Sequence, residues 1–172
     1  MKLRKIEDHE VGALIIREYK PDDCPLLAQL FYDTVHTVNA KDYTEDQLDA
    51  WATGNVNLDE WNRSFLAHTT LVAVWGGMIA GFADMDKSCY LDRLYVHKDY
   101  QGIGIATALV KELERRAIDE NAVSFETYAS ITARPFFEKL GYTVQAENIA
   151  VRGDVFLTNF RMTKVYRKEG EY

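Results

Sequence analysis

Residues 91–110 constrain the fold of this chain more than any other stretch. Residues 91–96 mix β-branched, aromatic and aliphatic side chains over a short run, which is typical of a buried strand. Over residues 104–120, apolar side chains recur at helical spacing with charged side chains between them, which predicts an amphipathic helix. Gly102 and Gly104 lie in the short turn that joins the two elements.

A strand that leads through a glycine turn into a helix creates a site for an anion. The first backbone N–H groups of a helix have no partner within the helix, and the positive end of the helix dipole lies behind them. A phosphate suits such a site best, and Gly104 lets the main chain approach it without a Cβ atom. The same two glycines would equally serve an ordinary strand-to-helix turn that binds nothing.

Longer motifs narrow this choice. The turn has neither the glycine and lysine pattern of a P-loop nor the third glycine of a dinucleotide-binding fingerprint. Its pattern Gln-x-x-Gly-x-Ala over residues 101–106, preceded by Leu-Tyr-Val at 94–96, resembles the coenzyme A pyrophosphate loop of the GNAT N-acetyltransferase superfamily. Residues 129–142 are similar to the next strand end and helix of that family, where Phe-Tyr-x-x-x-Gly-Phe is usual. The resemblance covers residues 69–165, and the nearest branch is the YafP-like one.

The resemblance implies acetyl-CoA as the acyl donor, without a metal. In GNAT enzymes the coenzyme enters where the fourth and fifth strands diverge, and N–H groups of the fourth strand hold the acetyl carbonyl. By position, this role falls on the main chain near Leu94–Val96, and the pyrophosphate would lie on the N–H groups of residues 101–106. The residues implied in coenzyme binding are Leu94, Tyr95, Val96, Gln101, Gly102, Ile103, Gly104, Ile105, Ala106, Thr107, Ser130 and Phe137.

Composition and charge agree with such a protein. A length of 172 residues suits a single domain over residues 1–172, and 47% apolar with 27% charged residues is ordinary for a soluble globular chain. The net charge of −7 argues against nonspecific nucleic-acid binding, which requires a basic face. Two cysteines without framework spacing, no membrane-spanning apolar run and no secretory signal predict a cytoplasmic protein with reduced thiols and no membrane contact. The sequence is compatible with a homodimer.

Periodicity and turn signals predict an α/β (α+β) fold. The expected GNAT-like architecture is a single mixed, mostly antiparallel sheet of seven strands, flanked by about four helices and splayed between strands 4 and 5. Strands are predicted at residues 13–18, 71–75, 78–83, 88–96, 123–129, 142–150 and 155–165, with a hairpin turn at Gly76-Gly77. Helices are predicted at residues 24–38, after a capping box at Thr44, from Asn57, and at 104–120 and 132–140, the last ended by Gly141.

Acyl transfer from a thioester requires a neutral amine and therefore a group that takes its proton. Asp92 is the first candidate, and strict alternation along its strand places it on one face with Tyr90 and Leu94. An acid at this point of the strand occurs in GNAT relatives that take polycationic substrates, where it faces the acceptor amine. The alternative is a structural ion pair with Arg93 or Lys87.

A second candidate for the base and the acid that protonates the leaving thiolate complete the catalytic predictions. Glu126, on the neighbouring strand, is the second candidate for the base, with a solvated or ion-paired glutamate as the alternative. GNAT enzymes often protonate the leaving thiolate with a tyrosine, but the corresponding position here is Phe137, and Ser130 stands where an asparagine often contacts the coenzyme. The remaining proton donors are solvent or one of the tyrosines Tyr128, Tyr95 and Tyr142.

Acceptor recognition in this fold normally comes from the first two helices and the last hairpin, and the first part of this chain is rich in aromatic residues. Tyr32, His36 and Tyr90 are the predicted acceptor contacts, and Arg152 and Asn159 are further candidates. Core packing is the alternative for each aromatic residue. No metal is expected, because none of the four histidines has metal-ligand spacing: His9, His36, His68 and His97.

The sequence therefore predicts a GNAT-like N-acetyltransferase that moves acetyl from acetyl-CoA to a primary amine of a small molecule or peptide by direct attack in a ternary complex. The first alternative is an acyl-CoA-binding or regulatory domain with the same fold and weak catalysis. The second is a structural domain whose glycine turn binds nothing.

Overall fold

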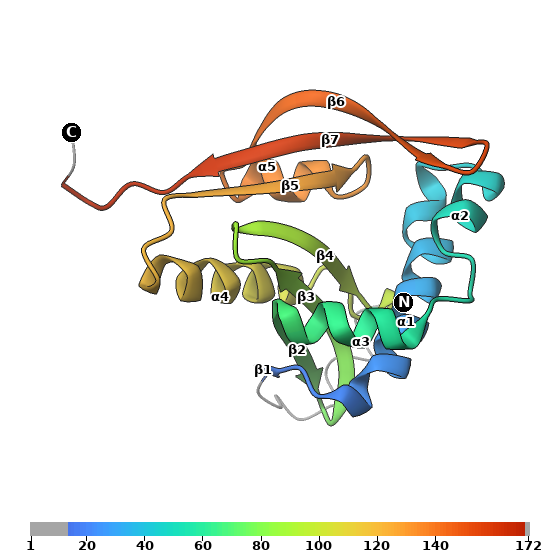
Figure 1. Cartoon of the computed structure of the whole chain (residues 1–172), viewed down its shortest axis with the longest axis horizontal. Helices are drawn as coiled ribbons and strands as arrows, with labels where there is room; N and C mark the ends of the chain where they lie inside the picture. Colours follow the sequence, from blue (N-terminus) through green and yellow to red (C-terminus); the bar gives the residue numbers. More distant parts are fainter. Residues whose placement is uncertain (1–13, 171–172) are drawn as a thin grey trace.

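The computed structural model describes residues 14–170. Its strands are β1 (Ile15–Glu18), β2 (Thr69–Trp75), β3 (Met78–Met85), β4 (Tyr90–Val96), β5 (Ser124–Ser130), β6 (Thr143–Arg152) and β7 (Val155–Val165). They form one sheet in the order β1-β2-β3-β4-β5-β7-β6 (Figure 1). All neighbouring strands are antiparallel except β4 and β5, which run parallel. The predicted seven-stranded, mostly antiparallel sheet is confirmed.

Within residues 14–170, five α-helices flank this sheet, one at each of the five predicted positions, where the expected GNAT-like architecture had about four. They are α1 (Cys24–Thr37), α2 (Glu45–Trp51), α3 (Leu58–Ala67), α4 (Ile105–Asp119) and α5 (Arg134–Lys139). Side chains of α4 and α5 belong to one hydrophobic cluster and those of α1, α2 and α3 to a second, so the sheet is the middle of three layers. Within residues 14–170, no helix has both the length and the apolar character that crossing a bilayer requires.

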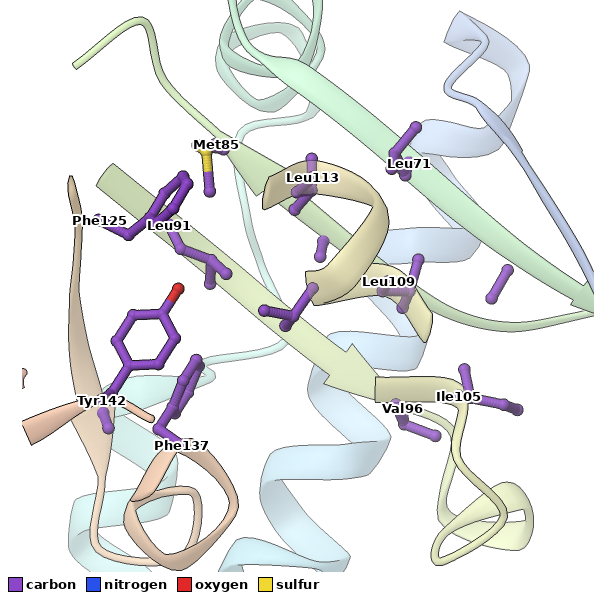
Figure 2. Packing of buried hydrophobic residues seen from close by; sticks show 14 of the residues in the cluster. Leu71, Met85, Leu91, Val96, Ile105, Leu109, Leu113, Phe125, Phe137 and Tyr142 are labelled. Carbon is purple, nitrogen blue, oxygen red and sulfur yellow. The ribbon is translucent and has the colours of Figure 1, made fainter. Parts of the chain in front are cut away.

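The first cluster packs α4 against β2, β3 and β4. Leu109 and Leu113 of α4 lie with Leu71 of β2 and Leu91 of β4 (Figure 2), and all four are at most 1% exposed. Burying one such leucine stabilises the fold by about 1.5–3 kcal/mol. Val72, the neighbour of Leu71, belongs to the second cluster. Because both faces of the sheet are covered, the middle of β2 is apolar on both sides, with Leu71 in the first cluster and Val72 in the second.

Three local signals in the sequence are confirmed. Thr44 Oγ1 accepts from the Gln47 N–H at 3.3 Å, and the Gln47 side chain accepts from the Thr44 N–H at 2.9 Å, which caps α2. Gly76 and Gly77 have φ angles of +56° and +78°, as the tight hairpin between β2 and β3 requires. Gly141, at φ +92°, follows the end of α5.

β4 begins two residues later than predicted because Asp86 organises a turn before it. The Asp86 Oδ1 accepts from the Ser88 N–H at 2.8 Å and from the Tyr90 N–H at 3.1 Å. Cys89 has a φ of +64°, which extended strand backbone does not allow.

β4 and β5 are paired only at their beginnings. The register joins Tyr90 to Glu126 and Leu91 to Thr127 and then stops. β4 remains paired with β3 as far as Val96, and β5 remains paired with β7 to its end. The two strands therefore diverge (Figure 1), as predicted, and their facing backbone edges lack strand partners.

Candidate active site

The turn between β4 and α4 has the geometry of an anion site. Gly102 and Gly104 have φ angles of +74° and +92°, and a Cβ atom built on either would meet nothing within 4 Å. Gly104 is the N-cap of α4, and its carbonyl accepts from the Ala108 N–H at 3.0 Å. The N–H groups of residues 105–107 therefore have no partner within the helix and lie at its positive end, beside open space.

The side chain of Gln101 holds this turn against the end of β4. Its Nε2 donates to the Val96 carbonyl at 2.6 Å, and Thr34 Oγ1 of α1 donates to the same carbonyl at 3.1 Å. Gly81 of β3 lies opposite Val96, and a Cβ atom there would lie 3.0 Å from the Tyr95 carbonyl oxygen. The sequence pointed to main-chain contacts in this turn and did not reveal these supports.

A cleft of about 440 Å³ lies between the glycine turn, the unpaired edges of β4 and β5, and α5; we call it the coenzyme cleft. Eleven of the twelve residues predicted to bind the coenzyme line it. The exception is Ile103, whose side chain packs on the first hydrophobic cluster. The cleft thus brings the free N–H groups of the turn and of β4 to one side of the molecule.

A second cleft, of about 480 Å³, lies on the side of α1 and α3; we call it the acceptor cleft. The two clefts share five lining residues, so they meet where β4 and β5 diverge: Trp51, Asp92, Tyr95, Tyr128 and Ser130. Much of the acceptor cleft is aromatic, through Phe31, Tyr43, Trp51, Trp61, Tyr90, Tyr95 and Tyr128.

A β-bulge places Asp92 at this meeting point. Asp84 of β3 lies opposite Arg93 and Met85 lies opposite Leu91, so Asp92 is an extra residue without a partner on β3. Such a bulge re-aims a side chain and increases the local twist.

The bulge also overturns the strict alternation predicted for β4. Leu91 and Leu94 both pack with the α4 cluster, although they are three residues apart. Arg93 lies on the other side, 5.1 Å from the ring centre of Trp61. Asp92 therefore does not share a face with Leu94, because the inserted residue shifts the side-chain period by one.

The surroundings of Asp92 favour its neutral form. Its side chain is 38% exposed and lies 3.4 Å from Arg93 Nη2. Arg93, however, donates to both oxygens of the fully buried Asp84, at 3.1 and 2.9 Å, so its charge is shared. Partial burial first, and then the negative charge of Asp84, raise the pKa of Asp92, while Arg93 opposes them. A carboxylate with a raised pKa is a better proton acceptor.

With this geometry established, the comparisons with known proteins identify the family. The family model described as acetyltransferase (GNAT) domain matches residues 39–164, most of the chain. The chain belongs to the GNAT acetyltransferase family.

Individual relatives agree with this assignment. The Escherichia coli (strain K12) protein described as uncharacterized N-acetyltransferase YafP is 33% identical over 148 residues, 86% of this chain and 93% of that protein. A crystal structure from Rhodopseudomonas palustris, described as a GCN5-related N-acetyltransferase, aminotransferase class-II, has a TM-score of 0.86 at 32% identity and covers 92% of this chain and 99% of that one. The PaiA N-acetyltransferase of Thermoplasma acidophilum, in complex with coenzyme A, has a TM-score of 0.74 at 19% identity and covers 90% and 99%.

The protein is therefore a GNAT enzyme, an acetyl-CoA-dependent N-acetyltransferase. The glycine turn fits the coenzyme, since it offers unpaired N–H groups beside open space where a Cβ atom would stand.

The second GNAT base candidate, Glu126, is engaged elsewhere. Its Oε2 accepts from Nε and Nη2 of Arg161 at 3.1 and 2.8 Å. Glu126 lines neither the coenzyme cleft nor the acceptor cleft. The structure thus has the ion-paired arrangement that was the alternative for this residue.

The tyrosines differ in their access to the reacting atoms. Tyr142 is 3% exposed, its hydroxyl bonds Glu114 at 3.2 Å in the core, and it lines neither cleft. Tyr95 lines both clefts, but its ring packs edge-on against Phe31. Tyr128 is 39% exposed and lines both clefts, so of these three tyrosines it combines access to solvent with a place at the junction. Phe137 is buried and has no proton to give.

Two of the predicted acceptor contacts lie away from the acceptor cleft. His36 Nε2 bonds the Ala52 carbonyl at 2.7 Å, and its ring centre lies 4.2 Å from that of Tyr32. The Tyr32 ring in turn lies against Gly54. These side chains pack on the segment after α2, a contact between distant segments that helical spacing did not reveal, and they line neither the coenzyme cleft nor the acceptor cleft. Tyr90, by contrast, lines the acceptor cleft, as do Arg152 and Asn159.

Several residues of the coenzyme cleft were not predicted from the sequence, because they come from segments that are distant along the chain. The coenzyme cleft is also lined by Thr34, Val38, Asn39, Tyr100, Thr132, Ala133, Phe136 and Lys139. Of these residues, only Lys139 carries a sequence signal for an anionic ligand. It is positively charged and lies next to the motif that ends at Gly141.

The histidines in residues 14–170 do not build a convincing metal site. His68, Asp84 and Asp92 have potential ligand atoms within 4.8 Å of one another. Both Asp84 oxygens, however, already accept from Arg93, whose positive charge would repel a cation. His97 Nδ1 accepts from the Asp99 N–H at 3.0 Å, and His9 lies outside the described residues.

Proposed function

We propose that this protein is a cytoplasmic enzyme, a GNAT domain over residues 1–172, that transfers acetyl from acetyl-CoA to a primary amine of a small molecule or peptide by direct attack in a ternary complex. The observation that carries the proposal is the meeting of two clefts at Asp92. One cleft presents backbone N–H groups suited to a pyrophosphate, and the other presents aromatic and polar side chains. Donor and acceptor would therefore be bound together, with the reacting atoms between them.

The residues at the junction supply the proton transfers. The acceptor arrives as an ammonium ion, and Asp92 takes its proton, which leaves a lone pair on nitrogen. The new C–N bond forms as the C–S bond of the thioester breaks, while N–H groups along the free edge of β4 near Leu94–Val96 stabilise the oxyanion. Tyr128 donates a proton to the leaving thiolate, and the phenolate then takes the extra proton from the new amide nitrogen, which restores the tyrosine. A coenzyme A thiol is acidic enough for solvent to replace Tyr128 in both transfers.

The acceptor cleft favours an amine attached to a flat or apolar body. Trp61 and Tyr90 lie on its walls, and aromatic faces bind such groups with little loss of side-chain entropy. Glu60 and Asp92 add negative charge that attracts an ammonium group, whereas the charge of Arg93 is largely neutralised by Asp84. Arg152 and Asn159, on the β6–β7 hairpin, are placed to contact the rest of the acceptor.

One observation favours the alternative of an acyl-CoA-binding domain with weak catalysis. Phe137 stands where many GNAT enzymes carry the tyrosine that protonates the thiolate. The position of Tyr128 in both clefts argues against this alternative, because it offers another donor at the junction.

A thiol-release screen tests the proposal. Purified protein and acetyl-CoA are incubated with amino acids, polyamines, peptides, aminoglycosides and aromatic amines, and free thiol is measured with and without each acceptor. Acceptor-dependent release that is lost in Asp92→Asn supports the proposal. Binding of acetyl-CoA without release for any acceptor would support the regulatory alternative, and failure to bind acetyl-CoA would reject both.

A further inference from the structure

A charged cluster extends from Asp92 through Arg93 and the buried Asp84 to His68. Asp84 is fully buried; its Oδ2 lies 2.7 Å from His68 Nδ1, and both its oxygens accept from Arg93. Each of His68, Asp84 and Asp92 has one nitrogen or carboxylate oxygen that lies within 4.8 Å of the corresponding atoms of the other two. His68 and Asp92 are therefore close neighbours, although His68 ends α3 and Asp92 lies in the middle of β4.

His68 lines a third cleft, of about 960 Å³, which we call the rear cleft. It lies between the end of α4, the turn after β3 and the beginning of β2, and it shares no lining residue with the coenzyme or acceptor cleft. The His68 side chain is 19% exposed. Solvent in the rear cleft thus reaches His68, while solvent reaches Asp92 from the other two clefts.

This arrangement matters once both substrates are bound. Asp92 lines the coenzyme cleft and the acceptor cleft, and in a ternary complex both are filled. The proton that Asp92 removes from the ammonium group must then leave by another route, or Asp92 stays protonated until a product departs. His68 has a potential ligand atom within 4.8 Å of Asp92 and faces this separate body of solvent.

We propose that His68 carries the acceptor proton from Asp92 to solvent in the rear cleft. The inference rests on the proposed role of Asp92. The O–H bond of protonated Asp92 breaks and an N–H bond on the imidazole forms, through one bridging water across the gap. The imidazolium then releases a proton to water or a buffer base in the rear cleft, which restores the Asp92 carboxylate. His68 lines neither substrate cleft and acts on the reaction only through Asp92.

The charges around His68 suit this transfer. Asp84 of β3 faces it directly, Asp92 and Arg93 of β4 lie beyond, and Asp86 lies in the turn after β3. The hydrogen bond to Asp84 is the main cause that raises the pKa of His68 above its usual 6.5, while Arg93 opposes it. The pKa of Asp92 is also raised, by burial and by Asp84. Asp84 therefore acts on both groups in the same direction: it disfavours the carboxylate of Asp92 and favours the imidazolium of His68.

A purely structural role for His68 is the rival explanation, since it supports the buried Asp84. Two variants separate the roles. In His68→Asn, the side-chain amide nitrogen replaces Nδ1 and keeps the bond to Asp84, but the residue no longer titrates. In His68→Ala, both the bond and the titration are lost, and space opens toward the rear cleft. Lys87→Ala is the matched control, because Lys87 lines the same cleft and is exposed.

Thiol-release kinetics with an active acceptor test the proposal. Both His68 variants should lower kcat at least about tenfold, below the 10²–10⁴-fold loss typical of removing the base itself, with KM for acetyl-CoA unchanged. Added imidazole should raise the kcat of His68→Ala in proportion to the imidazole concentration. It should leave the kcat of the parent, Lys87→Ala and Asp92→Asn unchanged. A His68→Asn variant with parental kcat across the pH range, or an absence of imidazole rescue, would overturn the proposal.

The titration of His68, followed by NMR, gives a readout that does not depend on turnover. Asp92→Asn should lower the pKa of His68, because one facing negative charge is removed. An equal pKa of His68 in the parent and in Asp92→Asn would contradict the coupling between the two residues. Loss of activity in Asp92→Asn but in neither His68 variant would reject the relay alone. Parental activity in Asp92→Asn would reject the proposed function and the relay together.

Discussion

The coenzyme cleft and the acceptor cleft are built in different ways. The coenzyme cleft depends on main-chain groups of one continuous stretch, from Leu94 in β4 to Thr107 in α4, together with the free edge of β5. The acceptor cleft depends on side chains that come from α1, α2, α3, β4, β5 and the β6–β7 hairpin.

This difference explains which substitutions each cleft tolerates without loss of binding. Backbone N–H groups are present whatever the side chain, so a coenzyme site changes only when a side chain blocks the approach or the turn loses its conformation. The acceptor cleft changes with every substitution on its walls. Relatives that share the fold can therefore share acetyl-CoA while they differ in acceptor, and the following experiments test that division.

The largest effect is expected at the junction of the clefts. Asp92→Asn should lower the rate of acetyl transfer by about 10²–10⁴-fold, because the proton acceptor is lost, while acetyl-CoA affinity stays nearly unchanged. Melting at neutral pH should be equal or higher, since the raised pKa of Asp92 means that its carboxylate form is disfavoured in the fold. Steady-state kinetics and thermal melts measure both. A variant that melts lower but acetylates at the parental rate would return Asp92 to an ion-pair role.

The next effect concerns the coenzyme cleft alone. Acetyl-CoA at a hundredfold its dissociation constant should stabilise the parent by about 2.7 kcal/mol, a melting shift of about 5–10 °C. Gly104→Glu places bulk and negative charge in the open space of the turn and should abolish this shift. Gly77→Glu is the matched control, because Gly77 also has a positive φ and an open Cβ position but lies in the β2–β3 hairpin. Loss of the shift in both variants would trace the effect to backbone strain and not to the turn.

A smaller effect is expected from the proton donor. Tyr128→Phe should lower kcat by about tenfold, less than general-acid removal usually costs, because a thiolate is a good leaving group. Tyr142→Phe should keep the parental kcat and instead lose stability of about 1 kcal/mol, since its hydroxyl bonds Glu114 in the core. Parental turnover in Tyr128→Phe would make solvent the proton source.

The smallest effect is a pH dependence of stability that originates outside both substrate clefts. The pKa of His68 is raised in the folded state, so its stabilisation is fully present below its usual 6.5 and is lost as pH rises through the raised value. The free energy of unfolding should therefore decline over that window in the parent, and His68→Asn should flatten the decline. Denaturant unfolding at several pH values measures this decline. An equal slope of unfolding free energy against pH in the parent and in His68→Asn would show that another group causes the pH dependence.

Much of the coenzyme cleft was predictable because its determinants are local in sequence. Gly102, Gly104 and the helical period that follows them are read from neighbouring residues, and the structure places them as the pattern indicated. The hairpin at Gly76-Gly77 and the cap at Thr44 were predictable for the same reason.

Predictions about side chains that meet across the fold were less successful. Tyr32 and His36 share a helix face, but only the tertiary structure shows that the segment after α2 packs on this face. Glu126 was an open candidate until β7 placed Arg161 beside it.

By itself, the sequence determined that this chain folds as a GNAT domain with an anion-binding turn, because backbone conformation and helix period follow from short-range sterics. Tertiary structure alone decided where Asp92 points. The bulge opposite Asp84 and Met85 shifts the side-chain period of β4 by one residue, and no local pattern encodes it. It also decided that His68 lies beside Asp92 through the buried Asp84, since that contact joins segments whose charges become neighbours only when the sheet forms.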